Sequence, residues 1–277
     1  MSIRDRYIPL ALIALTALAL PTAACDDGEA AGEGRLAVSI YGEAFIEEGI
    51  PPGEPGCDGC VEDGWAVTFD RFLIVVTAVE IPGVARDDTA RVFDLSRDSG
   101  GAGHPVVTFE VPAGHHHALD YTVAPAATLT PGNASVADVA YMADEGLAIY
   151  VEGRAERAGE VHTFAWGFTG ETRYTACEID AEVADGGEAS AELTIHADHL
   201  LYDDLDSGEP QVVFDLIAAS DADGDGSITR AELEARDISA ESRYQVGSRP
   251  IDDLWAFIAA QTATLGHIDG EGHCAQN

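Results

Sequence analysis

Residues 72–81 of this chain read FLIVVTAVEI, and this run decides the expected fold. Most of its side chains are apolar and many are β-branched, and such residues favour extended backbone. Directly before the run, Trp65, Val67 and Phe69 alternate with polar or small neighbours, as in a strand with one buried face. The segment therefore predicts strands at the centre of a β-sheet.

Shorter stretches of the same kind occur along the chain from residue 35 to about residue 199. Leu36, Val38 and Ile40 alternate with polar neighbours, and glycine, proline, aspartate and asparagine separate the later candidates. Those further strands are expected at residues 90–95, 105–111, 115–124, 147–152, 161–168, 172–179 and 191–197. Many short strands at this spacing predict a mainly β protein, either an antiparallel β-sandwich or a barrel, and we expect the sandwich over residues 35–200.

The hydrophobic period changes to a helical one after about residue 207. Apolar side chains recur at helical spacing within residues 210–220, and a last helix is expected at residues 250–265. Pro250 suits the first position of that helix, where a missing N–H costs nothing. Residues 201–277 are therefore expected to form a small helical unit packed on the sandwich.

Within this unit, residues 221–232 read DADGDGSITRAE. Carboxylates at loop positions 1, 3, 5 and 12, with glycine at position 6, match the register in which an EF-hand binds calcium. The expected calcium ligands are Asp221, Asp223, Asp225, Ser227, Thr229 and Glu232. Because no second loop of this type occurs in the sequence, we expect structural calcium at extracellular concentrations and not a switch.

The nine histidines indicate a second candidate metal site. His196 and His199 are separated by two residues, and His267 and His273 flank a glycine-rich turn near the C-terminus. Imidazoles gathered in this way suit zinc or copper. The alternative is that these are ordinary surface histidines held by hydrogen bonds.

The cysteines and the N-terminus indicate export. Residues 1–24 contain a basic start, an apolar run and small residues before Cys25, which is typical of a signal peptide. Cys25 is the expected lipidation site, with ordinary cleavage as the alternative, and residues 25–34 are expected to form a flexible acidic tether. The four remaining cysteines allow three disulfide pairings, of which we favour Cys57–Cys60 and Cys177–Cys274.

The formal net charge is −36, and the chain contains no lysine. This charge argues against nucleic acid and anionic lipid as partners. Adaptation to a saline habitat would explain it equally well. The charge identifies no protein or glycan partner, and the expected partners are calcium and a membrane reached through the lipid anchor.

Three segments together resemble a group of secreted bacterial lipoproteins without known function. They are HADHLLYDD (residues 196–204), the aspartate-rich loop, and GHIDGEGHC (residues 266–274), in the last third of the chain. The first half is more faintly similar to lipoprotein β-sandwich domains, in which a Pro-Ala-Gly turn like residues 112–114 follows a long strand. The resemblance implies a fold and a location at the bacterial cell envelope, in the periplasm or on the outer surface, but no activity.

Sequence motifs of common catalytic sites, such as Gly-x-Ser-x-Gly or His-Glu-x-x-His, are absent from the sequence. We therefore expect a non-enzymatic, calcium-binding exported lipoprotein. One alternative is a periplasmic or surface protein that binds copper or zinc through its histidines, with metal-dependent activity. A further alternative is a carbohydrate-binding or adhesive module, for which Trp65, Trp166 and Trp255 are the candidate platform.

Overall fold

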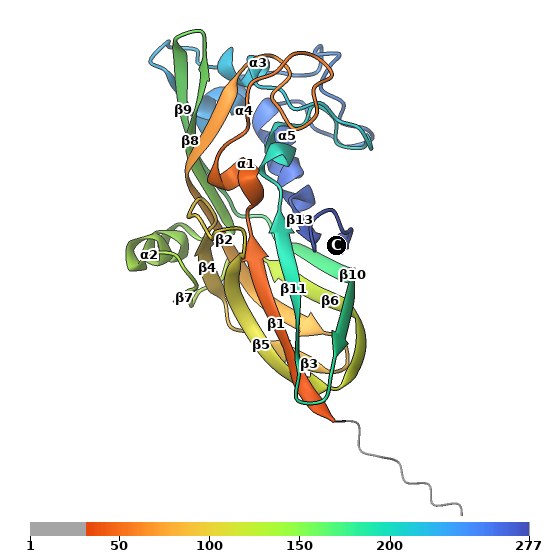
Figure 1. Cartoon of the computed structure of the whole chain (residues 1–277). Helices are drawn as coiled ribbons and strands as arrows, with labels where there is room; N and C mark the ends of the chain where they lie inside the picture. Colours follow the sequence, from red (N-terminus) through yellow and green to blue (C-terminus); the bar gives the residue numbers. More distant parts are fainter. Residues whose placement is uncertain (1–31, 277) are drawn as a thin grey trace, which may run out of the picture. The chain divides into compact units, whose positions relative to one another are not determined.

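The computed structural model describes residues 32–276, which belong to one compact unit. Strands dominate this unit, so the prediction of a mainly β protein is confirmed (Figure 1). The signal peptide, Cys25 and most of the predicted tether lie outside the described residues. The first strand begins at Glu33, two residues before the expected start of the β region.

Every strand expected from the sequence overlaps an observed one. The strands are β1 (Glu33–Tyr41), β2 (Ala66–Ile81), β3 (Ala85–Asp87), β4 (Arg91–Asp94), β5 (His104–Pro112), β6 (Gly114–Val123), β7 (Thr130–Pro131), β8 (Ile149–Arg157), β9 (Glu160–Phe168), β10 (Thr172–Val183), β11 (Glu188–Ile195), β12 (Ser227–Ile228), β13 (Gly266–Ile268) and β14 (Ala275–Gln276). The α-helices are α1 (Glu43–Glu47), α2 (Val136–Glu145), α3 (Asp215–Ala218), α4 (Arg230–Ala235) and α5 (Leu254–Gln261). Two 3₁₀ turns are η1 (Ala197–Leu201) and η2 (Thr262–Thr264).

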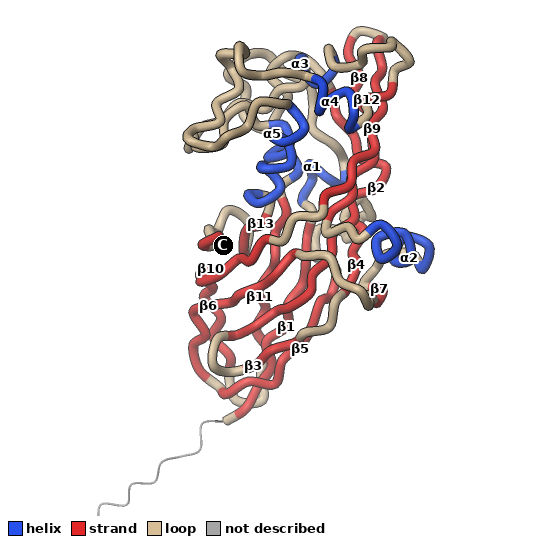
Figure 2. Tube along the Cα trace, turned by 180° about the vertical axis from the view of Figure 1, so that it is seen from behind, coloured by secondary structure: helices blue, strands red, loops and turns tan. Residues whose placement is uncertain are grey.

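The strands form two curled sheets, seen from opposite sides in Figures 1 and 2. The smaller sheet has the order β13-β11-β1-β5, and the larger one has the order β12-β9-β8-β2-β6-β10-β14 with β3, β4 and β7 attached. Most neighbours are antiparallel, as expected. The main exception is the parallel pair β1–β11, in which Leu36 lies opposite Ala189.

The long apolar run forms the second part of β2 up to its end at Ile81, and the two predicted pieces are a single strand of 16 residues. Its register with β8 shifts between Phe69 and Arg71, where one extra residue is accommodated. Beyond that point both faces are buried: Ile74 belongs to the main core, whereas Leu73 and Val75 belong to a second cluster. Burial on both faces explains why the sequence is continuously apolar instead of alternating.

The second cluster is covered by α2, a helix that the sequence analysis did not predict. Ser135 caps its start by accepting a hydrogen bond from the Asp138 amide, and Gly146 ends it in a left-handed conformation. Met142 is fully buried against Leu73 and Val75. The helix therefore protects the outer face of β2 from water.

Helices after residue 201 are shorter than expected. The expected helix at 210–220 is a single turn, α3, and the last helix starts at Leu254 and not at Pro250. Asp253 caps α5, and the residues before it bond to another segment: the Asp252 carbonyl accepts from the Ile238 amide at 2.9 Å. Strands β12, β13 and β14 join the region to both sheets, so it is not a separate compact unit.

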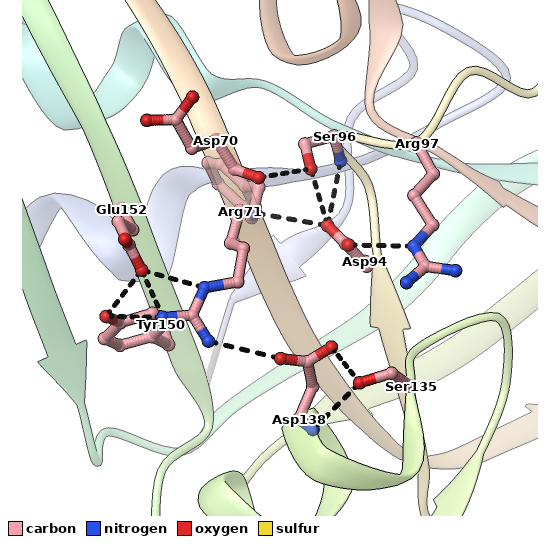
Figure 3. A network of polar contacts seen from close by, with 10 residues as sticks. Asp70, Arg71, Asp94, Ser96, Arg97, Ser135, Asp138, Tyr150 and Glu152 are labelled. Atoms are coloured by element: carbon pink, nitrogen blue, oxygen red, sulfur yellow. Dashed lines mark hydrogen bonds and ion pairs between the residues drawn. The ribbon is translucent and has the colours of Figure 1, made fainter.

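A network of charged side chains fixes α2 to the sheet (Figure 3). The Arg71 guanidinium on β2 donates to the carboxylates of Glu152 on β8 and Asp138 on α2, the latter at 3.2 Å. Asp138 also accepts from the Ser135 hydroxyl at 2.5 Å. Burial alone would raise the pKa of Asp138, but the hydrogen bonds from Ser135 and Arg71 outweigh it and lower that pKa.

We predict that Asp138→Asn destabilises the protein by about 2 kcal/mol at pH 7, because it removes a charged acceptor from two donors. A carboxyl whose pKa is lowered by folding stabilises the protein above its unfolded pKa of about 3.9 and loses that effect as the pH falls. Urea unfolding at pH 7 and at pH 3 should therefore show a difference from wild type that is smaller at pH 3. Asp144→Asn, on the exposed side of α2, is the control. An equal loss of stability in both variants would contradict the stabilising role assigned to the Asp138 carboxylate.

Candidate metal centres

The predicted calcium loop lies between α3 and α4. Carboxylate oxygens of Asp221, Asp223 and Glu232 lie within 4.8 Å of one another. Oxygens about 2.3–2.6 Å from one calcium ion are separated by at most about 5 Å, so this spacing suits a shared ion. Asp225 is not in that group. Its Oδ1 accepts from the Ser227 amide at 2.7 Å.

Hydrogen bonds inside the loop hold it curled. Asp221 accepts from the amide of Gly224 at 2.8 Å and from that of Gly226 at 2.9 Å. Gly226 has φ of +80°, a conformation that glycine adopts without strain. The glycine at position 6 of an EF-hand loop makes a sharp turn, and the backbone turns at Gly226 in this way.

Glu232 joins the two ends of the loop. Its Oε2 accepts from the Thr229 amide at 2.9 Å, and its Oε1 accepts from the Ala222 amide, also at 2.9 Å. Thr229 caps α4 in return by accepting from the Glu232 amide. The hydrogen bonds that Glu232 accepts lower its pKa, and the bond from the Thr229 amide has the largest effect. The carboxylate is therefore ionised at neutral pH.

The large sheet anchors the loop. Residues Ser227–Ile228 form β12, which pairs with β9, and the Trp166 indole on β9 donates to the Ile228 carbonyl at 2.9 Å. Ile228 and Leu233 are buried beneath the loop. His162, also on β9, places Nδ1 3.4 Å from Asp221 Oδ2. The sequence pattern indicates no role for His162, since only the fold brings it to the first position of the loop.

Three of the four candidate histidines come together at the end of the small sheet. His196 follows β11, His199 lies in η1, and His267 lies in β13, which pairs with β11. The ring centroids of His196 and His199 are 5.3 Å apart, and those of His196 and His267 are 4.4 Å apart. His273 is exposed, and of the other three rings it contacts only that of His267, with ring centroids 5.6 Å apart.

Two overlapping groups of potential ligands share His196. In the first, ligand atoms of His196, Asp198 and His199 lie within 4.8 Å of one another. In the second, the same holds for His196, His267 and Glu271. Each group contains two imidazoles and one carboxylate, a set found in zinc enzymes and in non-haem iron sites. The sequence had indicated the histidines, but it did not single out one carboxylate among so many.

The environment keeps the imidazoles of His199 and His267 neutral. Burial first, and the neighbouring His196 second, lower the pKa of His199 to about 4. Burial, His196 and His199 likewise lower the pKa of His267 to about 4. Both rings are therefore unprotonated at pH 7, which is the form that binds metal.

Hydrogen bonds orient the first group. The His199 Nδ1 lies 2.8 Å from the Thr264 carbonyl oxygen, so this nitrogen carries the proton and donates it. The Tyr202 hydroxyl donates to Asp198 Oδ2 at 2.8 Å, while the buried Asp198 Oδ1 has no hydrogen-bond partner. Burial raises the pKa of Asp198.

Two clefts meet at this cluster. The larger, of about 460 Å³, is lined by His196, Asp198 and His199 and by both cysteines of the Cys57–Cys60 pair. The smaller, of about 270 Å³, is lined on one side by His199, His267 and His273. Both reach Tyr202 and Glu271. Small molecules can therefore approach the cluster from solvent.

The structure confirms both favoured disulfide pairs. Cys57 bonds to Cys60 and Cys177 bonds to Cys274, with Cα–Cα separations of 6.0 Å and 4.2 Å. The second bond joins β10 to the C-terminal segment next to His273. It therefore holds the turn at residues 269–273 close to the histidine cluster.

Three further histidines and the candidate tryptophans lie elsewhere. His115 and His117 stack on the exposed face of β6, whereas His116 is buried and contacts the Pro112 carbonyl oxygen at 3.0 Å. The three tryptophans considered for a carbohydrate platform are buried; they are Trp65, Trp166 and Trp255. These rings pack in the core and offer no exposed platform.

No family model, curated protein or solved structure matches the chain. Within residues 32–276, no helix is both long enough and apolar enough to cross a bilayer.

We predict that replacing both Cys177 and Cys274 by alanine lowers the free energy of unfolding by about 4 kcal/mol, because the bond closes a loop of about 100 residues. Replacing Cys57 and Cys60 in the same way removes a bond between residues only 3 apart. In that second variant the free energy of unfolding should fall by at most about half as much. Denaturant unfolding under oxidising conditions measures both, and equal losses would refute the expectation.

Proposed function

We propose that the protein is a non-enzymatic, calcium-binding lipoprotein of the bacterial cell envelope, with calcium in a structural role. The observation that supports this most is the convergence of Asp221, Asp223 and Glu232 within 4.8 Å. These three carboxylates occupy positions 1, 3 and 12 of a loop whose sequence has the EF-hand register. In this proposal Asp225, Ser227 and Thr229 complete the oxygen shell.

Electrostatics favours a cation in this loop. Like charges only a few ångströms apart repel one another, and the cost is higher where water is partly excluded. The Asp221 side chain is only 6% exposed. A divalent ion would remove this repulsion, and a chain with net charge −36 concentrates cations around it.

The proposed ion organises the region after residue 201. It holds α3, the loop and α4 as one EF-hand-type unit against the β-sandwich. The pairing of β12 with β9 supports a structural role, because the sheet gives the single loop a fixed partner. Ile228 and Leu233 bury the inner side of the same unit.

Export and anchoring complete the proposal. Residues 1–24 act as the signal peptide and Cys25 carries the lipid that holds the protein to a bacterial membrane. Both disulfides support an oxidising compartment, where such bonds persist. The strongly acidic chain is an unsuitable partner for nucleic acid.

We predict that calcium raises the melting temperature of the chelator-treated full chain and binds with a stoichiometry of one. At a free concentration one hundred times the dissociation constant, the gain is about 2.7 kcal/mol. Glu232→Gln should weaken binding at least tenfold, about 1.4 kcal/mol, because a bidentate carboxylate is lost. Calorimetry and thermal melting measure both quantities.

Glu234→Gln provides the matched control. Glu234 lies on the same helix and pairs with Arg230 at the surface, outside the ligand register. Its variant should bind calcium as the wild type does. Absence of binding heat and of any melting shift in the wild type would reject the proposal.

A further inference from the structure

Asp198 is a buried acid with no arginine partner in the described part of the chain. Its residue is only 8% exposed, and among residues 32–276 no arginine forms an ion pair with it. One oxygen accepts from the Tyr202 hydroxyl, and the other has no partner. Buried carboxylates are normally paired, hydrogen-bonded or bound to metal. The unsatisfied oxygen therefore calls for a positive ligand.

The neighbouring histidines have the spacing of two ligands on one ion. A zinc–nitrogen bond of about 2.0–2.1 Å and a tetrahedral angle place two imidazole centroids about 5 Å apart. The rings of His196 and His199 are 5.3 Å apart. Since Nδ1 of His199 donates to the Thr264 carbonyl oxygen, the other ring nitrogen keeps its lone pair for a metal.

We propose that His196, Asp198 and His199 hold one divalent transition-metal ion, zinc or copper(II), at the floor of the larger cleft. Two nitrogens and one carboxylate oxygen suit these ions. They do not suit calcium, which requires six to eight oxygens. The site is thus distinct from the calcium loop in both ligands and ion.

The surroundings of the ion fit this assignment. Tyr202 and Thr264 bond to the ligands from behind and fix their orientation, as outer partners do in metal sites. Glu43 lies 3.7 Å from the His196 ring and adds negative charge. The fourth position faces the cleft of about 460 Å³, so a water molecule or a small ligand can occupy it.

The carboxylate of the first group is more buried and better oriented than that of the second group. The second group has His267 and Glu271 in place of Asp198 and His199. Glu271 is exposed on a turn, whereas Asp198 is buried and already oriented by a hydroxyl. In this arrangement His267 packs against His196 and closes one side of the site.

The test uses the purified full chain, stripped with chelator and kept in saturating calcium so that the loop is occupied. It is titrated with zinc sulfate in one arm and copper sulfate in another, and bound metal is counted by mass spectrometry. We expect one equivalent in at least one arm. His199→Ala and Asp198→Asn should weaken binding at least 100-fold, and Tyr202→Phe about tenfold.

The controls separate this site from other histidines. The double variant His115→Ala with His117→Ala, and the single variant His273→Ala, remove exposed rings and should leave binding unchanged. Circular dichroism checks that each variant folds, and the isosteric Asp198→Asn guards against collapse of the site. In the copper arm, electron paramagnetic resonance of the wild type should show two coordinating imidazole nitrogens.

Three results would overturn the proposal. The first is absence of stoichiometric binding in both arms. The second is loss of binding in the His115 and His117 double variant or in His273→Ala, since the metal would then sit on surface rings. The third is loss of metal binding in His267→Ala together with full binding in Asp198→Asn. That result would place the ion in the second group, with His267 and Glu271.

Discussion

The described structure depends on β2, a strand that must be covered on both faces. Its alternate side chains pack into two separate clusters, one shared with the small sheet and one sealed by α2. From β2 the larger sheet extends in order through β8, β9 and β12. The position of the calcium loop is therefore set by backbone ladders that start at β2. The Arg71 network holds the covering helix to the same strand.

The strands could be predicted because their patterns are local, whereas several other elements could not. α2 follows a long β region and exposes Val136 and Tyr141, so it lacks a continuous apolar stripe. Its capping residues, Ser135 and Gly146, were the available signal. The C-terminal strands are only two or three residues long and exist because of partners far away in sequence. Short segments of this kind carry no detectable period.

The calcium loop and the histidine cluster also differ in how far the sequence alone could predict them. All proposed calcium ligands lie within twelve consecutive residues, so their register was visible in the sequence. The histidines of the cluster come together only through the β11–β13 pairing and the Cys177–Cys274 bond. Of these two features, the cysteine count suggested only the disulfide. Its best-oriented carboxylate, Asp198, could not be distinguished from many other acids, because burial and the Tyr202 hydroxyl single it out only after folding.

The parallel pairing of β1 with β11 has a consequence for how the chain is made. β1 is the first described strand, yet its partner β11 begins about 150 residues later, and sheets built from such distant pairs form slowly. Until synthesis passes Ile195, one hydrogen-bonding edge of β1 stays open. An open edge invites pairing with other chains. A nascent molecule of this kind must therefore be kept from associating until its late strands have emerged.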